Sequence, residues 1–280
     1  MDKKYEPLKA QDYAEPCCPL SMEEFGKAPE IKPVPQQRII GKLDEYMARR
    51  DYPGAERHLN YWAEEARLGR DLKGLLLIMN EKIGFYRKTG KKEESFESIE
   101  RALQLIDELD YDGSISAGTT YTNAATACQN FGEPERAIGY FEKAKEIYES
   151  SSYTAPDLLG GLYNNMALSL TSLGRYEEAL DLYNKALGKM SDVQGGELEQ
   201  AITYLNMADT YVAMVGEESA EKKTEELLDK AYDLLVNSNA PEDGYLAFVY
   251  SKCAAVFSHY GYFLAANELS KKSEEIYERA

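Results

Sequence analysis

Apolar residues recur at helical spacing in two consecutive stretches near the middle of the chain. The first stretch has apolar residues three or four positions apart, on one face of an α-helix: Tyr163, Met166, Ala167 and Leu170. The second stretch has a similar face: Ala179, Leu182, Tyr183, Ala186 and Leu187. Gly174 lies between them and suits a helix C-terminus, because glycine adopts positive φ without steric cost. The pattern predicts a helix–turn–helix hairpin.

The same hairpin pattern is present in other parts of the chain. A copy 42 residues earlier keeps every offset: Tyr121, Ala124, Ala125, Cys128, Gly132, Ala137, Phe141 and Ala144. Further copies begin near Ile39, Met79, Tyr204 and Tyr250, which makes six between about residue 36 and the end. Alanines on facing helices allow the helix axes to approach closely, while tyrosines and leucines fill the space beside them. The chain is therefore predicted to be a stack of six helical hairpins.

This pattern resembles the tetratricopeptide repeat (TPR). The resemblance rests on an aromatic residue at repeat position 4, Ala at 8, Gly at 15, Ala at 20, an aromatic at 24 and Ala at 27, best matched by residues 118–151 and 160–193. It implies an all-α, right-handed superhelical solenoid of about six hairpins. The period of about 42, rather than 34, is similar to the repeats of kinesin light chain. Copy two departs from the pattern, with Ile83 and Ser95 at alanine positions.

Residues 1–35 differ from the repeat domain, residues 36–280. They contain six of the ten prolines, the last of them at the junction with the repeats, and no helical repeat, which favours an extended segment. They also contain several large apolar residues: Tyr5, Tyr13, Leu20, Met22 and Phe25. We expect this segment to lie against the solenoid, with its groove as one of the places open to it.

The charge and the cysteines bear on partners and location. The formal net charge is −17, so the chain should repel phosphate backbones and anionic lipid, and we expect neither nucleic acid nor membrane as a partner. No apolar run approaches the roughly 18 residues of a membrane span, and the N-terminus has no secretory signal. The four cysteines include the adjacent pair Cys17–Cys18 and no spaced framework, which favours a cytoplasmic location.

Asparagine occupies repeat position 6 in three successive copies, at Asn123, Asn165 and Asn206. Stacked hairpins curve with their first helices on the concave side, so these side chains are predicted to face a groove. An asparagine amide both donates and accepts hydrogen bonds. The row resembles the asparagine ladder of long-period TPR proteins, which implies binding to the backbone of an extended peptide. The alternative is that these amides bind neighbouring helices or loops.

Other residues are predicted to line the same groove: Asn80, Arg87, Lys88, Thr126, Gln129, Asn130, Asn164 and Asp209. Most of them are polar and uncharged, which suits a peptide backbone with small or apolar side chains. The basic pair Arg87 and Lys88 would suit one acidic group of the ligand. An unoccupied, solvated face is the alternative.

The sequence contains no arrangement of residues typical of an enzyme. The chain has two histidines, and it lacks a phosphate-binding loop and the H-E-x-x-H metal motif. We therefore expect no catalytic residue, metal or cofactor, and a non-enzymatic scaffold that binds a protein or peptide. One alternative is a peptide-sensing regulator that acts through a partner protein and is inhibited by its own N-terminal segment. Homodimerisation through a terminal repeat also stays open.

Overall fold

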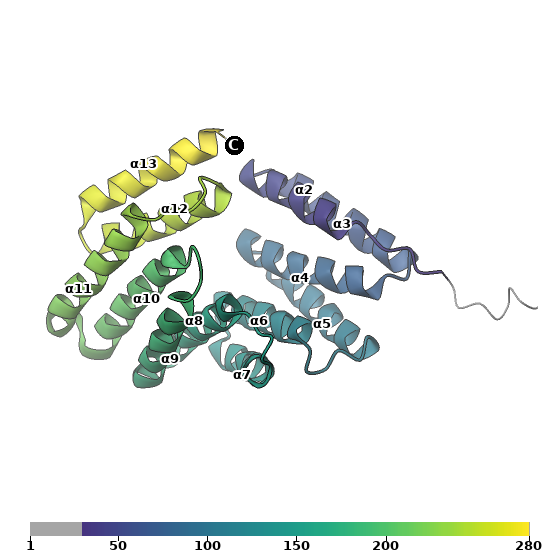
Figure 1. Cartoon of the computed structure of the whole chain (residues 1–280), viewed down its shortest axis with the longest axis horizontal. Coiled ribbons are helices and arrows are strands. Elements are labelled where there is room, and N and C mark those ends of the chain that lie inside the picture. The colour runs from purple at the N-terminus through teal and green to yellow at the C-terminus, as the bar shows by residue number, and fades with distance from the viewer. Residues whose placement is uncertain (1–29, 280) are drawn as a thin grey trace, which may run out of the picture.

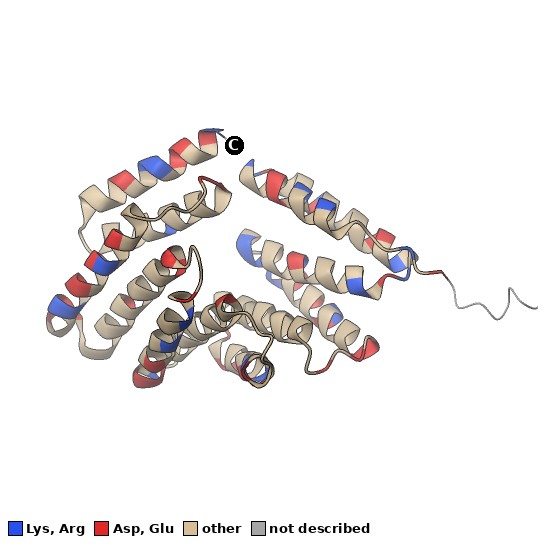
Figure 2. Ribbon diagram, in the orientation of Figure 1, with Lys and Arg blue, Asp and Glu red and all other residues tan. Residues whose placement is uncertain are grey.

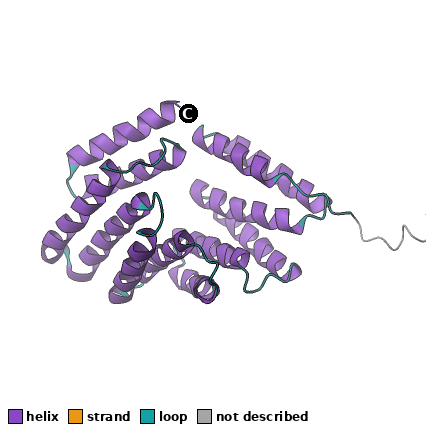
Figure 3. Ribbon diagram, viewed as in Figure 1, coloured by secondary structure: helices purple, strands orange, loops and turns teal. Residues whose placement is uncertain are grey.

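The structure is a computed structural model that describes residues 30–279 of the 280-residue chain. Within that part it contains twelve α-helices and no strand (Figures 1 and 3). The helices pair in chain order into six hairpins, so the prediction of an all-α solenoid is confirmed. The hairpins are α2 (Gln36–Ala48) with α3 (Tyr52–Leu68), α4 (Leu72–Thr89) with α5 (Lys92–Glu108), α6 (Ile115–Asn130) with α7 (Pro134–Ser150), α8 (Pro156–Ser172) with α9 (Tyr176–Met190), α10 (Glu197–Val215) with α11 (Glu217–Val236), and α12 (Gly244–His259) with α13 (Phe263–Arg279).

Local sequence signals fix where the helices start and stop. The Asp71 carboxylate caps α4 by accepting the backbone N–H of Gly74 at 2.9 Å, and the Ser114 hydroxyl caps α6 by accepting that of Ala117 at 3.1 Å. Each cap satisfies a backbone donor that the first turn of a helix leaves unpaired. The predicted glycine breaks are confirmed, because the glycines that follow four of the first helices have φ between 74° and 81°: Gly90, Gly132, Gly174 and Gly261.

Small residues allow the helices of a hairpin to pack closely. The alanines at the repeat positions of the two central hairpins are fully buried, and Phe141 and Tyr183 fill the space beside them. Gly118 shows how tight this contact is, because a Cβ built there would lie 2.4 Å from a ring carbon of Tyr148. The repeat pattern is therefore a packing pattern, as the sequence predicts.

The two ends of the solenoid touch each other. The Arg50 guanidinium, in the turn after α2, lies 4.8 Å from the ring centre of Tyr277 in α13. The Lys88 ammonium, near the end of α4, lies 5.7 Å from the ring centre of Phe248 in α12. Figure 1 shows the end of α13 beside the end of α2. The curvature of six hairpins thus brings the first and last repeats into contact.

Residues 30–35 pass along the turn between α3 and α4. The Lys32 N–H donates to the Gly69 carbonyl oxygen at 2.8 Å. Val34 is buried, and its N–H donates to the Asp71 carboxylate at 2.9 Å. Predictions that concern residues 1–29, including the Cys17–Cys18 pair, lie outside the described residues. Among residues 30–279, no helix combines the length and apolar character needed to cross a bilayer.

Candidate peptide-binding face

The first helices of the hairpins form the inside of the curve. Neighbouring first helices contact one another along the solenoid, as α4 does with α6 and α8 with α10. Second helices instead pack on the first helix of the next hairpin, as α7 does on α8. Helices approach more closely on the inside of a curve, so the first helices are the concave side. We call the surface that α4, α6, α8, α10 and α12 present there the inner face.

One cluster of polar side chains joins α4 to α6 on the inner face. The Asn80 amide donates to the Thr120 hydroxyl at 2.9 Å and to the Leu76 carbonyl oxygen at 3.1 Å. The Asn80 carbonyl oxygen accepts from the Asn123 amide at 2.9 Å. Both helices are thus held at a fixed distance by hydrogen bonds between their side chains.

A second cluster repeats this arrangement between α8 and α10. The Asn164 carbonyl oxygen accepts from the Thr203 hydroxyl at 3.2 Å and from the Asn206 amide at 3.1 Å. Asn164 is only 6% exposed, and Thr203 is also buried. In each cluster, an asparagine of one repeat binds a threonine and an asparagine three residues apart in the next repeat. Asn123 and Asn206 therefore each donate one N–H to an asparagine of a neighbouring first helix.

Asn165 differs from the other two members of the predicted ladder. It is half-buried on α8, between the two clusters, and its side chain forms no hydrogen bond with any residue from 30 to 279. Its amide keeps both N–H groups and its carbonyl oxygen for an external partner. Asn123 and Asn206 each keep one N–H and the oxygen.

The remaining polar residues predicted for the groove have several kinds of partner. The Gln129 amide donates to the Ser172 hydroxyl of α8 at 2.9 Å, and the Thr126 hydroxyl donates to the Thr122 carbonyl oxygen at 2.8 Å. Asp209 accepts from the Tyr260 hydroxyl at 2.6 Å, and Asn130 is exposed at the end of α6. Most of these residues bind within or between first helices and leave only part of their capacity for a ligand.

A basic cluster lies where the second and last hairpins meet. The ammonium groups of Lys88 and Lys252 lie 5.7 and 5.8 Å from the ring centre of Phe248, which is 39% exposed. Arg87 precedes Lys88, and Figure 2 shows basic residues at this end of α4. Within residues 30–279 none of these three cations forms an ion pair. The arrangement offers positive charge beside an apolar ring.

Burial and neighbouring charges shift the pKa values of Arg87, Lys88 and the nearby Glu81. Burial lowers the pKa of Arg87. Burial and then the charge of Arg87 lower the pKa of Lys88, while Glu81 and Asp44 act in the opposite direction. Burial raises the pKa of Glu81, with a further contribution from Asp44. An anion bound here would relieve the repulsion between Arg87 and Lys88.

A partial signal for the two clusters is present in the sequence, although the spacing of the asparagines alone does not predict them. Thr120 and Thr203 each stand three residues before a ladder asparagine, whereas Leu162 stands three residues before Asn165. Phe248 had no such signal, because its place opposite Lys88 depends on the closure of the solenoid.

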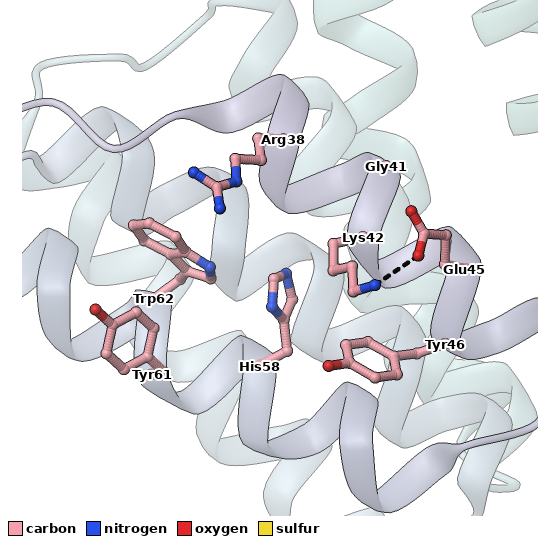
Figure 4. Close-up of a pocket in the computed structure, with 8 residues that line it drawn as sticks. All are labelled: Arg38, Gly41, Lys42, Glu45, Tyr46, His58, Tyr61 and Trp62. Atoms are coloured by element: carbon pink, nitrogen blue, oxygen red, sulfur yellow. Dashed lines mark hydrogen bonds and ion pairs between the residues drawn. The ribbon is translucent and has the colours of Figure 1, made fainter.

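A hollow of about 530 Å³ lies on another part of the surface, on α2 and α3 (Figure 4).

Comparison with known proteins identifies the family. A profile of the tetratricopeptide repeat matches residues 75–150 and 158–223, which are just over half of the chain. The chain belongs to the tetratricopeptide repeat family, so the predicted resemblance to that repeat is confirmed. A comparison with curated protein sequences gave no significant match.

Solved structures of other repeat proteins are similar in fold. NprR in complex with its cognate peptide NprX has a TM-score of 0.55 at 19% identity, covering 86% of this chain and 68% of that chain. BtubC (BKLC) from P. vanneervenii has a TM-score of 0.49 at 18% identity, covering 87% and 91%. The TPR-like repeats of a kinesin light chain from Podosopora anserina have a TM-score of 0.49 at 16% identity, covering 71% and 92%. At these identities the likeness concerns the fold.

Proposed function

We propose that this protein is a non-enzymatic scaffold that binds an extended peptide or protein segment on its inner face. The observation that carries the proposal is the state of the three ladder asparagines. Among residues 30–279, the Asn165 amide has no hydrogen-bond partner, and Asn123 and Asn206 each keep an N–H and an oxygen without one. An extended peptide presents alternating N–H and C=O groups, which such a row can bind whatever the side chains are.

The two polar clusters support this proposal energetically. A binding site gains affinity when its groups are already ordered, because less conformational entropy is lost on binding. Hydrogen bonds from Asn123 to Asn80 and from Asn206 to Asn164 fix two of the three ladder amides before any ligand arrives. The internal bonds of the ladder residues are thus compatible with a binding role.

The basic cluster indicates where an acidic group of the proposed ligand would bind. Lys88 and Lys252 lie over the ring of Phe248, and Arg87 precedes Lys88 on α4. We propose that an acidic group of the ligand lies there, with neutral or apolar residues along the asparagines. The formal net charge of −17 supports a protein or peptide ligand rather than nucleic acid, and a cytoplasmic location is part of the same proposal.

A peptide-sensing regulator is the second candidate. The observation that favours it is the contact of the last hairpin with the first, at Arg50 and Tyr277, and with the second, at Lys88 and Phe248. A ligand near Lys88 would touch both ends of the solenoid and change how they meet, which a partner protein could detect.

The test uses a synthetic library of octapeptides and affinity selection read by mass spectrometry. We expect the full-length protein to retain peptides, and the Asn165→Ala variant to bind the best of them about tenfold more weakly, the equivalent of about 1.4 kcal/mol. Asn184→Ala is the matched control, because Asn184 is exposed on the second helix α9. Failure of the wild-type protein to retain any peptide, or equal affinities for the Asn165 and Asn184 variants, would contradict the proposal.

A further inference from the structure

The first hairpin has a face that every inner hairpin buries. The helices α4, α8 and α10 are each packed by the second helix of the preceding hairpin. Residues 30–279 include no helix before α2. Positions that hold buried Leu162, Met166 and Leu170 in α8 hold Arg38, Lys42 and Tyr46 in α2. This side of the first hairpin is therefore uncovered among the described residues.

The uncovered side contains a hollow of about 530 Å³ lined by aromatic rings (Figure 4). The ring centres of Tyr46 and His58 are 5.7 Å apart, those of His58 and Trp62 are 6.4 Å apart, and those of Tyr61 and Trp62 are 5.1 Å apart. The rings form a continuous row, held in part by the His58 Nε2–H, which donates to the Ile39 carbonyl oxygen at 3.0 Å. Tyr61 is 57% exposed, although a row of rings is costly to leave in water.

Helix α2 lines the hollow with Arg38 and Gly41, and Gly41 leaves the helix backbone uncovered by a side chain there. Gly41 lies in the interior of α2, where glycine costs roughly 1 kcal/mol relative to alanine. A Cβ built on Gly41 would meet no other heavy atom within 4 Å, so packing inside the described residues does not require this glycine. Arg38 beside it forms no ion pair within residues 30–279. Among residues 30–279, the hollow thus offers apolar rings, the unpaired cation of Arg38 and close access to the backbone of α2.

We propose that residues 1–29 of the same chain dock in this hollow. Rows of exposed aromatic rings bind proline-rich extended segments, whose stiffness reduces the entropy lost on docking. Residues 1–29 contain four prolines and several large apolar residues, among them Tyr5, Tyr13 and Phe25. Their six acidic and four basic residues give a net negative charge that suits Arg38. Residue 30 is only eight positions before Arg38, so the C-terminal end of the segment is close in sequence to the lining of the hollow.

The covalent connection makes this segment a better occupant than a free peptide. Because a short connection joins residues 1–29 to the first hairpin, the effective concentration of this segment at the hollow is on the order of 1 mM. A site with a dissociation constant of about 0.1 mM would then be mostly filled by the chain itself, while a free peptide at micromolar concentration would leave it empty. Docking here would leave the inner face open, in contrast to inhibition by a segment lying along the asparagines.

Photo-crosslinking in the full-length protein identifies the occupant directly. Tyr61 is replaced by benzoylphenylalanine, which reacts with C–H bonds in contact with it, and the products are digested and sequenced by mass spectrometry. We expect an intramolecular crosslink to a residue between 1 and 29. The same replacement at Tyr153, which is 91% exposed, is the control and should give no such crosslink. A crosslink to a second copy of the chain, a crosslink only to residues beyond 29, or no crosslink would overturn the proposal.

A second measurement tests the chemistry of docking. Trp62 is the only tryptophan, so its fluorescence reports on the hollow alone. In a full-length variant with Tyr5, Tyr13, Leu20, Met22 and Phe25 changed to Ser, we expect acrylamide to quench Trp62 at least twofold more efficiently. Gly41→Leu, whose Cβ would meet no other heavy atom within 4 Å, adds a large side chain to the lining of the hollow and should reduce the Tyr61-site crosslink at least fivefold. Unchanged quenching together with an unchanged crosslink would refute docking in this hollow.

Discussion

Asn164 and Asn165 are adjacent residues of the same type, and the structure predicts opposite consequences for their replacement by alanine. Asn164 is 6% exposed and its oxygen accepts from Thr203 at 3.2 Å and from Asn206 at 3.1 Å. Asn165 has no hydrogen bond to lose among the described residues. The first substitution should therefore lower stability, and the second should lower ligand binding.

The magnitude for Asn164→Ala follows from its two partners. The Thr203 hydroxyl keeps another acceptor, the Glu199 carbonyl oxygen at 2.8 Å, so this partner loses little. The Asn206 amide loses its partner in a half-buried place. With about 0.5–1.5 kcal/mol for each hydrogen bond, we expect a loss of about 1–2 kcal/mol. At roughly 2–4 °C for each kcal/mol in a chain of this size, Tm should fall by about 2–8 °C.

The assay is thermal and urea unfolding of the two single variants and the Asn164→Ala/Asn206→Ala double variant. Because both residues form one bond, the double variant should be less destabilised than the sum of the single variants, by about 1 kcal/mol. Asn165→Ala should leave Tm within about 1 °C of the wild type. A stable Asn164→Ala variant, an Asn165→Ala variant with an equal loss, or strict additivity in the double variant would refute the assignment of the cluster.

Three further predictions concern packing, closure and pH. Gly118→Ala should lower the urea midpoint by the equivalent of about 1–3 kcal/mol, because its Cβ would lie 2.4 Å from Tyr148, whereas Gly84→Ala, with nothing within 4 Å, should raise the midpoint. Arg50→Ala should increase the radius of gyration in X-ray scattering, since it removes a cation–π contact between the first and last hairpins; an unchanged scattering curve would count against closure in solution. Burial raises the pKa of the Cys128 thiol from 9.0 to about 11, so the unfolded chain releases this proton first as pH rises. The free energy of unfolding should then fall between pH 9 and 11, by at most about 1.4 kcal/mol per pH unit, and less steeply in Cys128→Ala; equal slopes in both proteins would contradict this.

The ladder illustrates the limit of reading a site from repeat positions. Asn123, Asn165 and Asn206 share one repeat position, and the sequence treats them as equivalent. The structure separates them, because the partner of each amide comes from the preceding repeat. Asn123 binds Asn80 and Asn206 binds Asn164, and both partners stand at repeat position 5. A threonine three residues before an asparagine, with an asparagine in the repeat before, is the signal that distinguishes a bound amide from a free one.

The hairpins, their turns and their packing residues follow from the amino-acid sequence alone. Those features depend on contacts within a repeat and with its nearest neighbour, and the period of about 42 residues copies them from one hairpin to the next. Closure of the solenoid depends on the complete fold. It places Arg50 on Tyr277 and Lys88 on Phe248, and it results from small rotations added over six hairpins. No local pattern encodes such a sum, so the meeting of the first and last repeats becomes visible only when the whole chain is folded.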